Sequence, residues 1–404
     1  MQISSKIIHL PVLFLIVFSL AACQGVPSFL EKPPTLAPTP TATHLVTRTA
    51  TATALPTVTL TPAPSATPTV SPTPTPLLLV ESGAPLPGNL APITLESAGG
   101  VSGLAEWFEQ SVVDLAWVPD STLLAVASNE QINLYQLETR GVLRTLYPGK
   151  PGIVDISFSP NGSWLLAGCR QGDQNTGYSS SLEMWVGPNW KPLGLIYGSD
   201  RALTSMTFSP NSKWFTAAYA SKHYYENFVD IWNTLTWTIS ETMTTGTALG
   251  VAFSSDGALL AVTPDRYAVK VWNFEERTWA YRLPTSFTGA VNTMVFSPDG
   301  VTLATGHYDG MVRLWNTVEG TLLLEFDTGA VVQSLAFSPD ARMLASGGSY
   351  ENSLVQLWSS GSGKLLRKLE SQSGGISSLT FSPNGQYLVS ASYDGTLRLW
   401  GIRP

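Results

Sequence analysis

Residue types that hold metal ions or act as nucleophiles are scarce in this sequence of 404 residues. It has four histidines and two cysteines, and neither His223 nor His307 has another histidine or a cysteine at the short spacing of a zinc site. A Gly-x-Ser-x-Gly elbow, a phosphate-binding glycine-rich loop and a dinucleotide fingerprint are also absent from the sequence. We therefore expect no metal site, no cofactor and no catalytic residue, so the protein is not expected to be an enzyme.

Asp-Gly pairs such as Asp256-Gly257 and Asp299-Gly300 offer carboxylates that could bind calcium. They lie in a repeated segment of the Ser-Pro-Asp-Gly type and lack the alternating carboxylates that a calcium loop needs. Asp-Gly and Asn-Gly readily adopt the positive φ angles of tight hairpin turns. We therefore interpret these pairs as turns between strands.

The turns separate short apolar runs, and the clearest set lies near the end of the chain. Residues 376–381, 387–391 and 396–400 alternate between apolar and polar side chains, with many β-branched and aromatic residues. This alternation is typical of half-buried strands. The breaks at residues 382–385 and 392–395 contain Asn-Gly and Asp-Gly, so three antiparallel strands are expected here.

The same arrangement occurs seven times. Each copy begins at an apolar run ending in an aromatic anchor, and the anchors are 41 to 50 residues apart: Trp117, Phe158, Phe208, Phe253, Phe296, Phe337 and Phe381. A second aromatic closes the third run of each copy: Tyr135, Trp185, Trp232, Trp272, Trp315, Trp358 and Trp400. Six of these are followed by a fourth apolar run, such as residues 142–146, 322–326 or 365–369. The pattern predicts an all-β fold, a seven-bladed β-propeller of four-stranded antiparallel blades.

Repeats such as VNTMVFSPDGVTLATGHYDGMVRLWN, residues 291–316, resemble WD40 repeats, and the resemblance covers about residues 101–400. Two features depart from the family. The usual Trp-Asp pair is replaced, for example by Trp232-Asn233, and the Gly-His pair before the first strand is missing. The resemblance therefore implies that the family's Asp–His–Ser–Trp hydrogen-bonded tetrad cannot form completely. Asp309 and Asp394 keep the family's turn aspartate, and we interpret them as braces of their turns.

Only four residues follow Trp400, so the seventh blade lacks a fourth strand of its own. Residues 101–107 precede the first repeat, where a fourth strand would normally lie. We predict that this N-terminal strand completes blade seven and closes the ring, which removes an exposed sheet edge. The propeller domain is then expected to span residues 92–404.

Residues 1–22 have the pattern of a signal peptide, with Lys6 before an apolar stretch too short to span a bilayer comfortably. The segment Leu20-Ala21-Ala22-Cys23 resembles the lipobox of bacterial lipoproteins, which implies acylation of Cys23. An ordinary secretory signal and an uncleaved anchor are the alternatives. Residues 23–91 are rich in threonine and proline and predict a disordered, extended tether. These features predict a lipid-anchored protein of the cell envelope, on the extracytoplasmic side of a bacterial membrane.

Charge and cysteine content restrict the partners. The formal net charge is −7, and lysine and arginine are scattered without a basic stripe, so nucleic acid is not an expected partner. Cys169 is left without a disulfide partner if Cys23 carries lipid, and we expect a small buried side chain in a strand.

Tyrosines between the second and third strands of the repeats are the candidate partner-binding residues. They are Tyr178, Tyr224, Tyr225, Tyr267, Tyr308, Tyr350 and Tyr393, with Tyr219 in the same predicted loops. Insertions at residues 170–181 and 219–227 are expected to enlarge the same face. Tyrosine combines a large apolar area with a polar tip and few rotamers, which favours binding, although the rings could merely cover the ends of the blades.

These observations predict a membrane-anchored, non-catalytic WD40-repeat scaffold that binds another protein through a monomeric propeller. The alternative is an envelope propeller that binds or hydrolyses a sugar, a peptide or a small metabolite at the mouth of the central channel. That alternative requires ionisable residues to converge there, and the candidates are Arg170, Asp173, His223, Glu226, Arg266, His307 and Asp309. A third possibility is a purely structural surface protein, which would self-associate.

Overall fold

The computed structural model describes residues 90–403, except 138–140, 174–176, 221–226, 247–249, 266, 284–288 and 370–371. The predicted signal peptide, Cys23 and most of the predicted tether lie outside the described residues. So do His223, Tyr224, Tyr225, Glu226 and Arg266. The described part is all β apart from one 3-10 turn, η1 (Ala98–Gly100), and within it no helix is long and apolar enough to cross a membrane.

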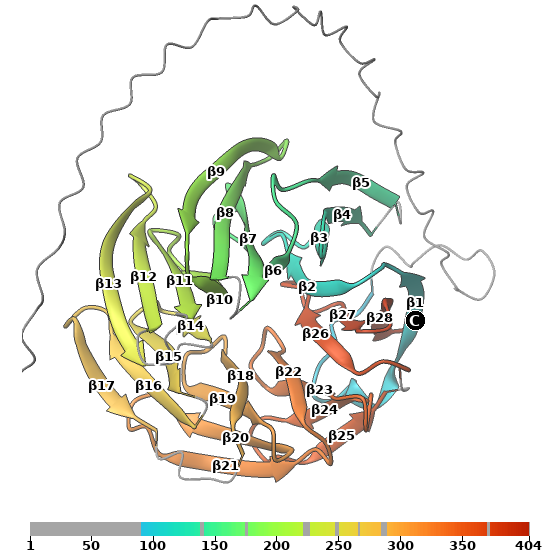
Figure 1. The fold of residues 1–404 in the computed structure, drawn as a ribbon. Helices are drawn as coiled ribbons and strands as arrows, with labels where there is room; N and C mark the ends of the chain where they lie inside the picture. Colours follow the sequence, from blue (N-terminus) through green and yellow to red (C-terminus); the bar gives the residue numbers. More distant parts are fainter. Residues whose placement is uncertain are drawn as a thin grey trace, which may run out of the picture. The chain divides into compact units, whose positions relative to one another are not determined.

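The strands form seven four-stranded antiparallel sheets, which we number as blades along the chain (Figure 1). Blade one contains β2 (Val112–Trp117), β3 (Leu123–Ser128), β4 (Ile132–Gln136) and β5 (Gly141–Leu146). Blade two contains β6 (Ile153–Phe158), β7 (Trp164–Asp173), β8 (Gly177–Val186) and β9 (Lys191–Ser199). Blade three contains β10 (Ala202–Phe208), β11 (Trp214–Ala220), β12 (Asn227–Asn233) and β13 (Thr238–Gly246).

The remaining blades follow in the same order. Blade four contains β14 (Val251–Phe253), β15 (Leu259–Asp265), β16 (Ala268–Asn273) and β17 (Thr278–Arg282). Blade five contains β18 (Val291–Phe296), β19 (Thr302–His307), β20 (Met311–Asn316) and β21 (Leu322–Asp327). Blade six contains β22 (Val332–Phe337), β23 (Met343–Gly348), β24 (Val355–Ser359) and β25 (Leu365–Lys368). Blade seven contains β26 (Ile376–Phe381), β27 (Leu388–Ser392), β28 (Thr396–Ile402) and β1 (Val101–Phe108). The predicted seven-bladed propeller is therefore confirmed.

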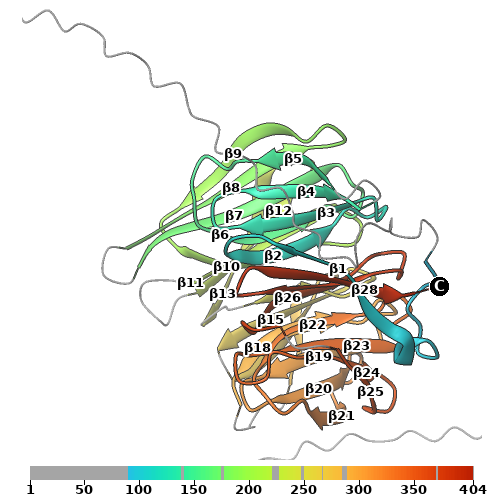
Figure 2. The same cartoon turned by 90° about the vertical axis from the view of Figure 1, so that its right-hand side faces the viewer.

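The ring is closed by the N-terminal strand, as predicted. β1 pairs antiparallel with β28, from Val101 opposite Ile402 to Phe108 opposite Thr396. Both views of the propeller show β1 beside β28 (Figures 1 and 2). Trp107, on β1, is buried and belongs to a cluster that joins blades seven and one. The two ends of the propeller are thus held by the same sheet.

The aromatic anchors fill the spaces between neighbouring blades. All seven are buried, and Phe381, for example, packs in one cluster with Ala336 and Met343 of blade six. The tight turns also agree with the sequence, because Gly385 and Gly395 have φ angles of 71° and 88°. Packing between blades and positive-φ turns within them therefore explain why the repeat recurs.

Blade two corrects one expectation. Its insertion was predicted to be a loop, but β7 and β8 continue as a paired hairpin out to Asp173 opposite Gly177. Tyr178 therefore lies on a strand, half-buried, opposite Gly172. Tyr219 is also a strand residue, on β11, and it is fully buried, so it offers no surface to a partner. The placement of Tyr178 and Tyr219 on strands depends on strand register and burial, which the residue pattern alone did not show.

Cys169 lies on β7 and is buried, as expected from its apolar neighbours. Burial and the carboxylate of Glu183 raise the pKa of its thiol to about 12. The thiolate, which is the reactive form of cysteine, is therefore scarce at neutral pH. The environment of Cys169 fits a packing role.

The innermost strands surround the centre of the ring and are joined by hydrogen bonds between blades (Figure 1). The Ile156 backbone N–H of blade two donates to Asp114 Oδ2 of blade one at 3.1 Å, and Met206 N–H of blade three donates to Asp155 Oδ2 at 2.7 Å. Ser334 accepts from Leu379 N–H in the same way at 3.0 Å, between blades six and seven. These side chains act as clamps between neighbouring blades.

Asp114 and Asp155 also hydrogen-bond to each other. Burial raises the pKa of both carboxyl groups, and the charge of Asp114 raises the pKa of Asp155 further. Two adjacent carboxylates repel each other, so the pair is favoured when it holds a proton. Because its oxygens accept bonds from backbone amides, we interpret the pair as a structural clamp.

Asp155→Asn is expected to raise the melting temperature by a few degrees at about pH 8 and to lose this effect near pH 4. With a raised folded-state pKa, Asp155 stabilises the fold fully only below its unfolded pKa of about 3.9, and this contribution is lost as the pH rises. Asparagine imitates the protonated carboxyl group and still accepts from Met206. Thermal unfolding of both proteins across this pH range is the measurement. A difference that does not change with pH would contradict the assignment.

Candidate binding surface

Three of the predicted tyrosines lie together on one face of the ring, and we call Tyr308, Tyr350 and Tyr393 the tyrosine cluster. Each lies in the turn between the second and third strands of its blade, in blades five, six and seven respectively. Their side chains are exposed, with 52%, 65% and 47% of their surface accessible. Consecutive blades therefore present one large aromatic side chain each at the same end of the sheet.

The rings contact across the blade boundary. Tyr350 and Tyr393 are stacked, with ring centroids 5.5 Å apart and planes inclined by 19°. Partial burial raises the pKa of Tyr393, and the neighbouring Tyr350 and Tyr308 raise it further. The stacked pair thus has Tyr308 as a neighbour close enough to affect the pKa of Tyr393.

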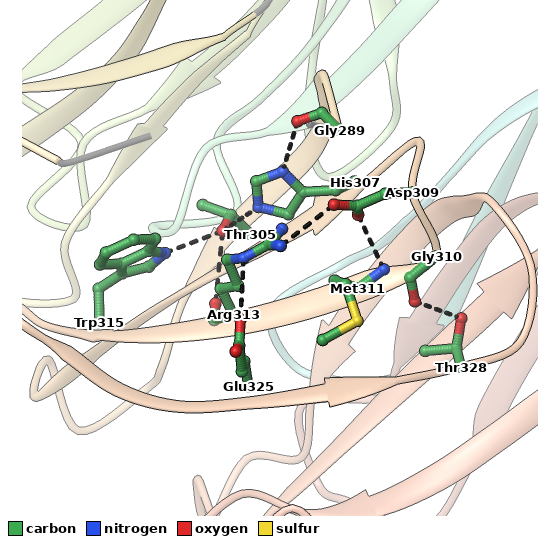
Figure 3. Close-up of polar contacts among 10 residues, drawn as sticks. All are labelled: Gly289, Thr305, His307, Asp309, Gly310, Met311, Arg313, Trp315, Glu325 and Thr328. Atoms are coloured by element: carbon green, nitrogen blue, oxygen red, sulfur yellow. Dashed lines mark hydrogen bonds and ion pairs between the residues drawn. The ribbon is translucent and has the colours of Figure 1, made fainter. Parts of the chain in front are cut away.

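Hydrogen bonds hold the turn that carries Tyr308 (Figure 3). The Asp309 carboxylate accepts from Met311 N–H at 3.0 Å and from Arg313 Nη2 at 3.1 Å. The backbone N–H of Tyr308 donates to Ala290 O at 2.9 Å, in the segment that enters β18. Asp309 therefore braces its turn, as the sequence suggested.

Arg313 is the cation beneath this turn. Its side chain is buried on β20, and its Nε donates to Glu325 at 3.2 Å while Nη2 donates to Asp309 (Figure 3). Burial tends to raise the pKa of Asp309, but the bonds from Arg313 and Met311 outweigh it and lower the pKa. Asp309 is thus ionised at neutral pH, with its charge shared with a neighbour inside the blade.

A buried chain of side chains supports the same turn from within blade five (Figure 3). Trp315 Nε1 donates to Thr305 Oγ1 at 2.9 Å, and Thr305 Oγ1 lies 2.8 Å from His307 Nε2. His307 Nδ1 lies 3.1 Å from the carbonyl of Gly289, which can only accept, so Nδ1 carries the proton. Burial lowers the pKa of His307, which agrees with a neutral ring.

These hydrogen-bonded side chains show how much of the family's tetrad is present. The tetrad is incomplete, because Asp309 bonds to Arg313 and the Gly-His pair is missing, but His307 at the end of β19 takes the histidine's place. In blade seven, Trp400 Nε1 donates to Ser390, whose hydroxyl donates to Gln372 at 2.6 Å. Blades five and seven therefore keep most of the network with substituted residues.

The turn of blade seven is braced as well. Thr396 N–H donates to Asp394 Oδ1 at 2.8 Å, and Tyr393 N–H donates to Gly375 O at 3.0 Å. Burial opposes ionisation of Asp394, but bonds from the Ser373 hydroxyl and the Thr396 backbone bring its pKa to about 2. Both Tyr308 and Tyr393 are consequently carried on firmly held turns.

One aromatic residue on this face was not predicted from the sequence. Phe108 ends β1, is 58% exposed, and its ring lies against Gly395 in the turn that carries Tyr393. Its side chain points away from the buried Trp107 because successive strand residues face opposite sides. The strand VSGLAEWF contained the signal, because the apolar residue after Trp107 falls on the opposite, exposed side of the strand.

The other predicted residues have different surroundings. Tyr267 is exposed on the corresponding turn of blade four. Of the ionisable residues considered for the channel mouth, His307 is buried with both ring nitrogens engaged, and Arg170 donates to Leu203 O at 3.2 Å. Within the described residues, no three histidine, cysteine, aspartate or glutamate side chains group in a way that could hold a metal ion. The tyrosine cluster is therefore the stronger candidate for a binding surface.

Comparison with known proteins identifies the repeats. The family model for the WD domain, G-beta repeat, matches residues 141–175, 281–316, 320–359 and 363–401. Each match begins at the outer strand of one blade or just before it and continues into the next blade. The last three end at the final residue of that blade's third strand or one residue before it. The last three matches coincide with the blades that carry the tyrosine cluster.

Known relatives share parts of the chain. A Periodic tryptophan protein 2 homolog from Neurospora crassa is 41% identical over 68 residues, 17% of this chain and 8% of that protein. Periodic tryptophan protein 2 from Arabidopsis thaliana is 26% identical over 268 residues, 61% of this chain and 29% of its own length. Protein FIZZY-RELATED 3 from Arabidopsis thaliana is 33% identical over 85 residues, 21% of this chain and 18% of that protein. The matched regions span less than a third of each relative. The chain therefore carries four WD40 repeats within a seven-bladed β-propeller.

Proposed function

We propose that this protein is a non-catalytic scaffold that binds another protein through the tyrosine cluster. The observation that carries the proposal is the set of three exposed tyrosines on adjacent blades, two of them stacked at 5.5 Å. Large rings on fixed turns lose little conformational entropy when a partner covers them, so they favour association. The WD40 repeats support the same conclusion, because three of the four matched segments lie in the blades that carry the cluster.

We further propose that the scaffold is a bacterial lipoprotein, held on the extracytoplasmic side of a membrane through acylated Cys23. The support is the sequence of residues 1–23 and the threonine- and proline-rich tether that follows. One acyl chain binds a membrane only marginally, so stable attachment requires more than one chain on Cys23. The propeller would then work at a distance from the lipid surface.

Photo-crosslinking in living cells tests the scaffold. The full-length chain would carry p-benzoylphenylalanine in place of Tyr350 or, separately, Tyr393. The matched control places the same group at Leu235, which is 90% exposed on the turn between β12 and β13, at the opposite end of its blade. One discrete partner protein is expected from both tyrosine positions and not from the control. No crosslinked protein, or the same product from Leu235, would contradict the proposal.

A thiol count on purified full-length protein tests the anchor. In denaturant, one cysteine should react if Cys23 is acylated, because only Cys169 keeps a free thiol. Two reactive thiols, or a Cys23→Ala protein that stays with the membrane, would contradict lipid attachment at Cys23.

A further inference from the structure

Each member of the tyrosine cluster is followed by a carboxylate. The pairs are Tyr308-Asp309, Tyr350-Glu351 and Tyr393-Asp394. The corresponding turn of blade one has an exposed Glu130 but no tyrosine, and in blade four Tyr267 is followed by alanine. Among the described turns between second and third strands, the combination of a ring with an acid therefore occurs in blades five to seven, where the cluster lies, while Tyr225-Glu226 of blade three falls outside the described residues.

These carboxylates give the aromatic surface a negative border. The pKa of Asp394 is about 2 and that of Asp309 is lowered, so both are ionised at neutral pH. Glu351 is exposed, and Asp327, also exposed, lies beside Gly310 in the turn of Tyr308. The three turns themselves, residues 307–311, 349–353 and 392–395, contain neither lysine nor arginine.

Arg313 offsets the charge of this border at one of the three turns. Arg313 is buried, and its guanidinium is directed to Asp309 and Glu325 inside blade five. Its salt bridge with Asp309 reduces the net charge at one turn, whereas Glu351 and Asp394 lie on the next two blades. An incoming group therefore meets tyrosine faces, which are negative at the ring centre, next to carboxylates.

We propose that the tyrosine cluster binds an arginine-bearing, positively charged segment of the partner protein. A guanidinium is planar, stacks on aromatic faces and pairs with carboxylates through its fixed donors, so one side chain can use both features of the surface. The inference rests on the proposed scaffold function and specifies the chemistry of its partner. Neutral sugars stack on aromatic rings and can donate hydrogen bonds to carboxylates, but they lack the charge attraction that a guanidinium gains, and anionic ligands would be repelled.

Binding of defined synthetic peptides tests the inference on the full-length protein. The probe is a fluorescent octapeptide of alternating arginine and glycine, measured by anisotropy at low salt. Its control replaces every arginine with citrulline, which keeps the shape and removes the charge. Saturable binding of the arginine peptide, and not of the citrulline peptide, is expected, and it should weaken as salt is added.

Variants locate the site. Tyr350→Leu with Tyr393→Leu should weaken binding by about 10-fold, whereas the corresponding phenylalanine pair, which keeps the ring faces, should stay within about 2-fold of the parent. Glu351→Gln should weaken binding by about 3-fold. Glu130→Gln removes another exposed carboxylate, from blade one, and should have no effect, which excludes attraction by net charge alone. Thermal unfolding of each variant confirms that it is folded.

Several results would overturn the inference. They are no saturable binding of the arginine peptide at millimolar concentration, equal binding of the citrulline peptide, or equal losses from Glu351→Gln and Glu130→Gln. A neutral oligosaccharide that binds in a tyrosine-dependent way, in place of the peptide, would also overturn it. Each of these results leaves the crosslinking test untouched, so the scaffold proposal can stand when the chemistry of its partner is different.

Discussion

Replacement of Trp107 by alanine is expected to destabilise the propeller by about 3–5 kcal/mol, as for other large buried aromatics. Trp107 is 4% exposed, and its ring lies 5.6 Å from that of Tyr135 in blade one. It belongs to β1, so its loss also weakens the strand that joins blade seven to blade one. The midpoint of urea unfolding, followed by tryptophan fluorescence and circular dichroism, is the measurement.

Its neighbour provides the control. Phe108 is on the same strand but 58% exposed, so Phe108→Ala should change stability by no more than about 0.5 kcal/mol. Trp107→Phe keeps an aromatic ring in the cluster and should lie between the two. Equal effects of Trp107→Ala and Phe108→Ala would show that β1 contributes little to ring closure.

Thr305→Val should destabilise the protein by about 2–4 kcal/mol although it preserves the shape of the side chain, because it leaves two buried polar groups unsatisfied. The lost hydroxyl is the one that accepts from Trp315 Nε1 and contacts His307 Nε2. Thermal or urea unfolding measures the effect. The large loss expected from a nearly isosteric change separates hydrogen bonding from packing.

Thr305→Ser restores the hydroxyl and removes one methyl group, so it should cost only about 1 kcal/mol. If valine and serine destabilise the protein equally, the hydroxyl does not carry the stability. If Thr305→Val destabilises the protein less than Thr305→Ser, the buried hydrogen bonds from Trp315 to His307 do not stabilise blade five.

Local regularities made the propeller predictable from the sequence. Side-chain alternation marked the strands, so residues 376–381 match β26 and residues 322–326 fall within β21. Asn-Gly and Asp-Gly located the turns, and Gly385 and Gly395 indeed have positive φ. The closing strand followed from a count of strands, because the seventh copy lacked a fourth run. Each of these signals is contained within a few residues of the chain.

Features that depend on how neighbouring blades pack could not be predicted from local sequence patterns. The stacking of Tyr350 on Tyr393 depends on the angle between blades six and seven, which no local pattern encodes. The replacement of the missing Gly-His pair by His307 depends on the direction of one side chain at the end of β19. Likewise, Asp114 and Asp155 are 41 positions apart and become neighbours only because β2 and β6 pack side by side.

The pairing of β1 with β28 has a consequence for how the protein is made. Val101 and Ile402 are roughly 300 residues apart in the chain yet lie opposite each other in one ladder. Synthesis proceeds from the N-terminus, so β1 emerges before the other described strands and keeps an unpaired edge until β28 is released. Such distant pairing slows folding and extends the time during which the open edge can meet another molecule. A nonsense mutation that removes only residues 396–404 would therefore leave the earliest strand without its partner, and even so short a truncation is expected to send the nascent protein towards chaperones and proteases.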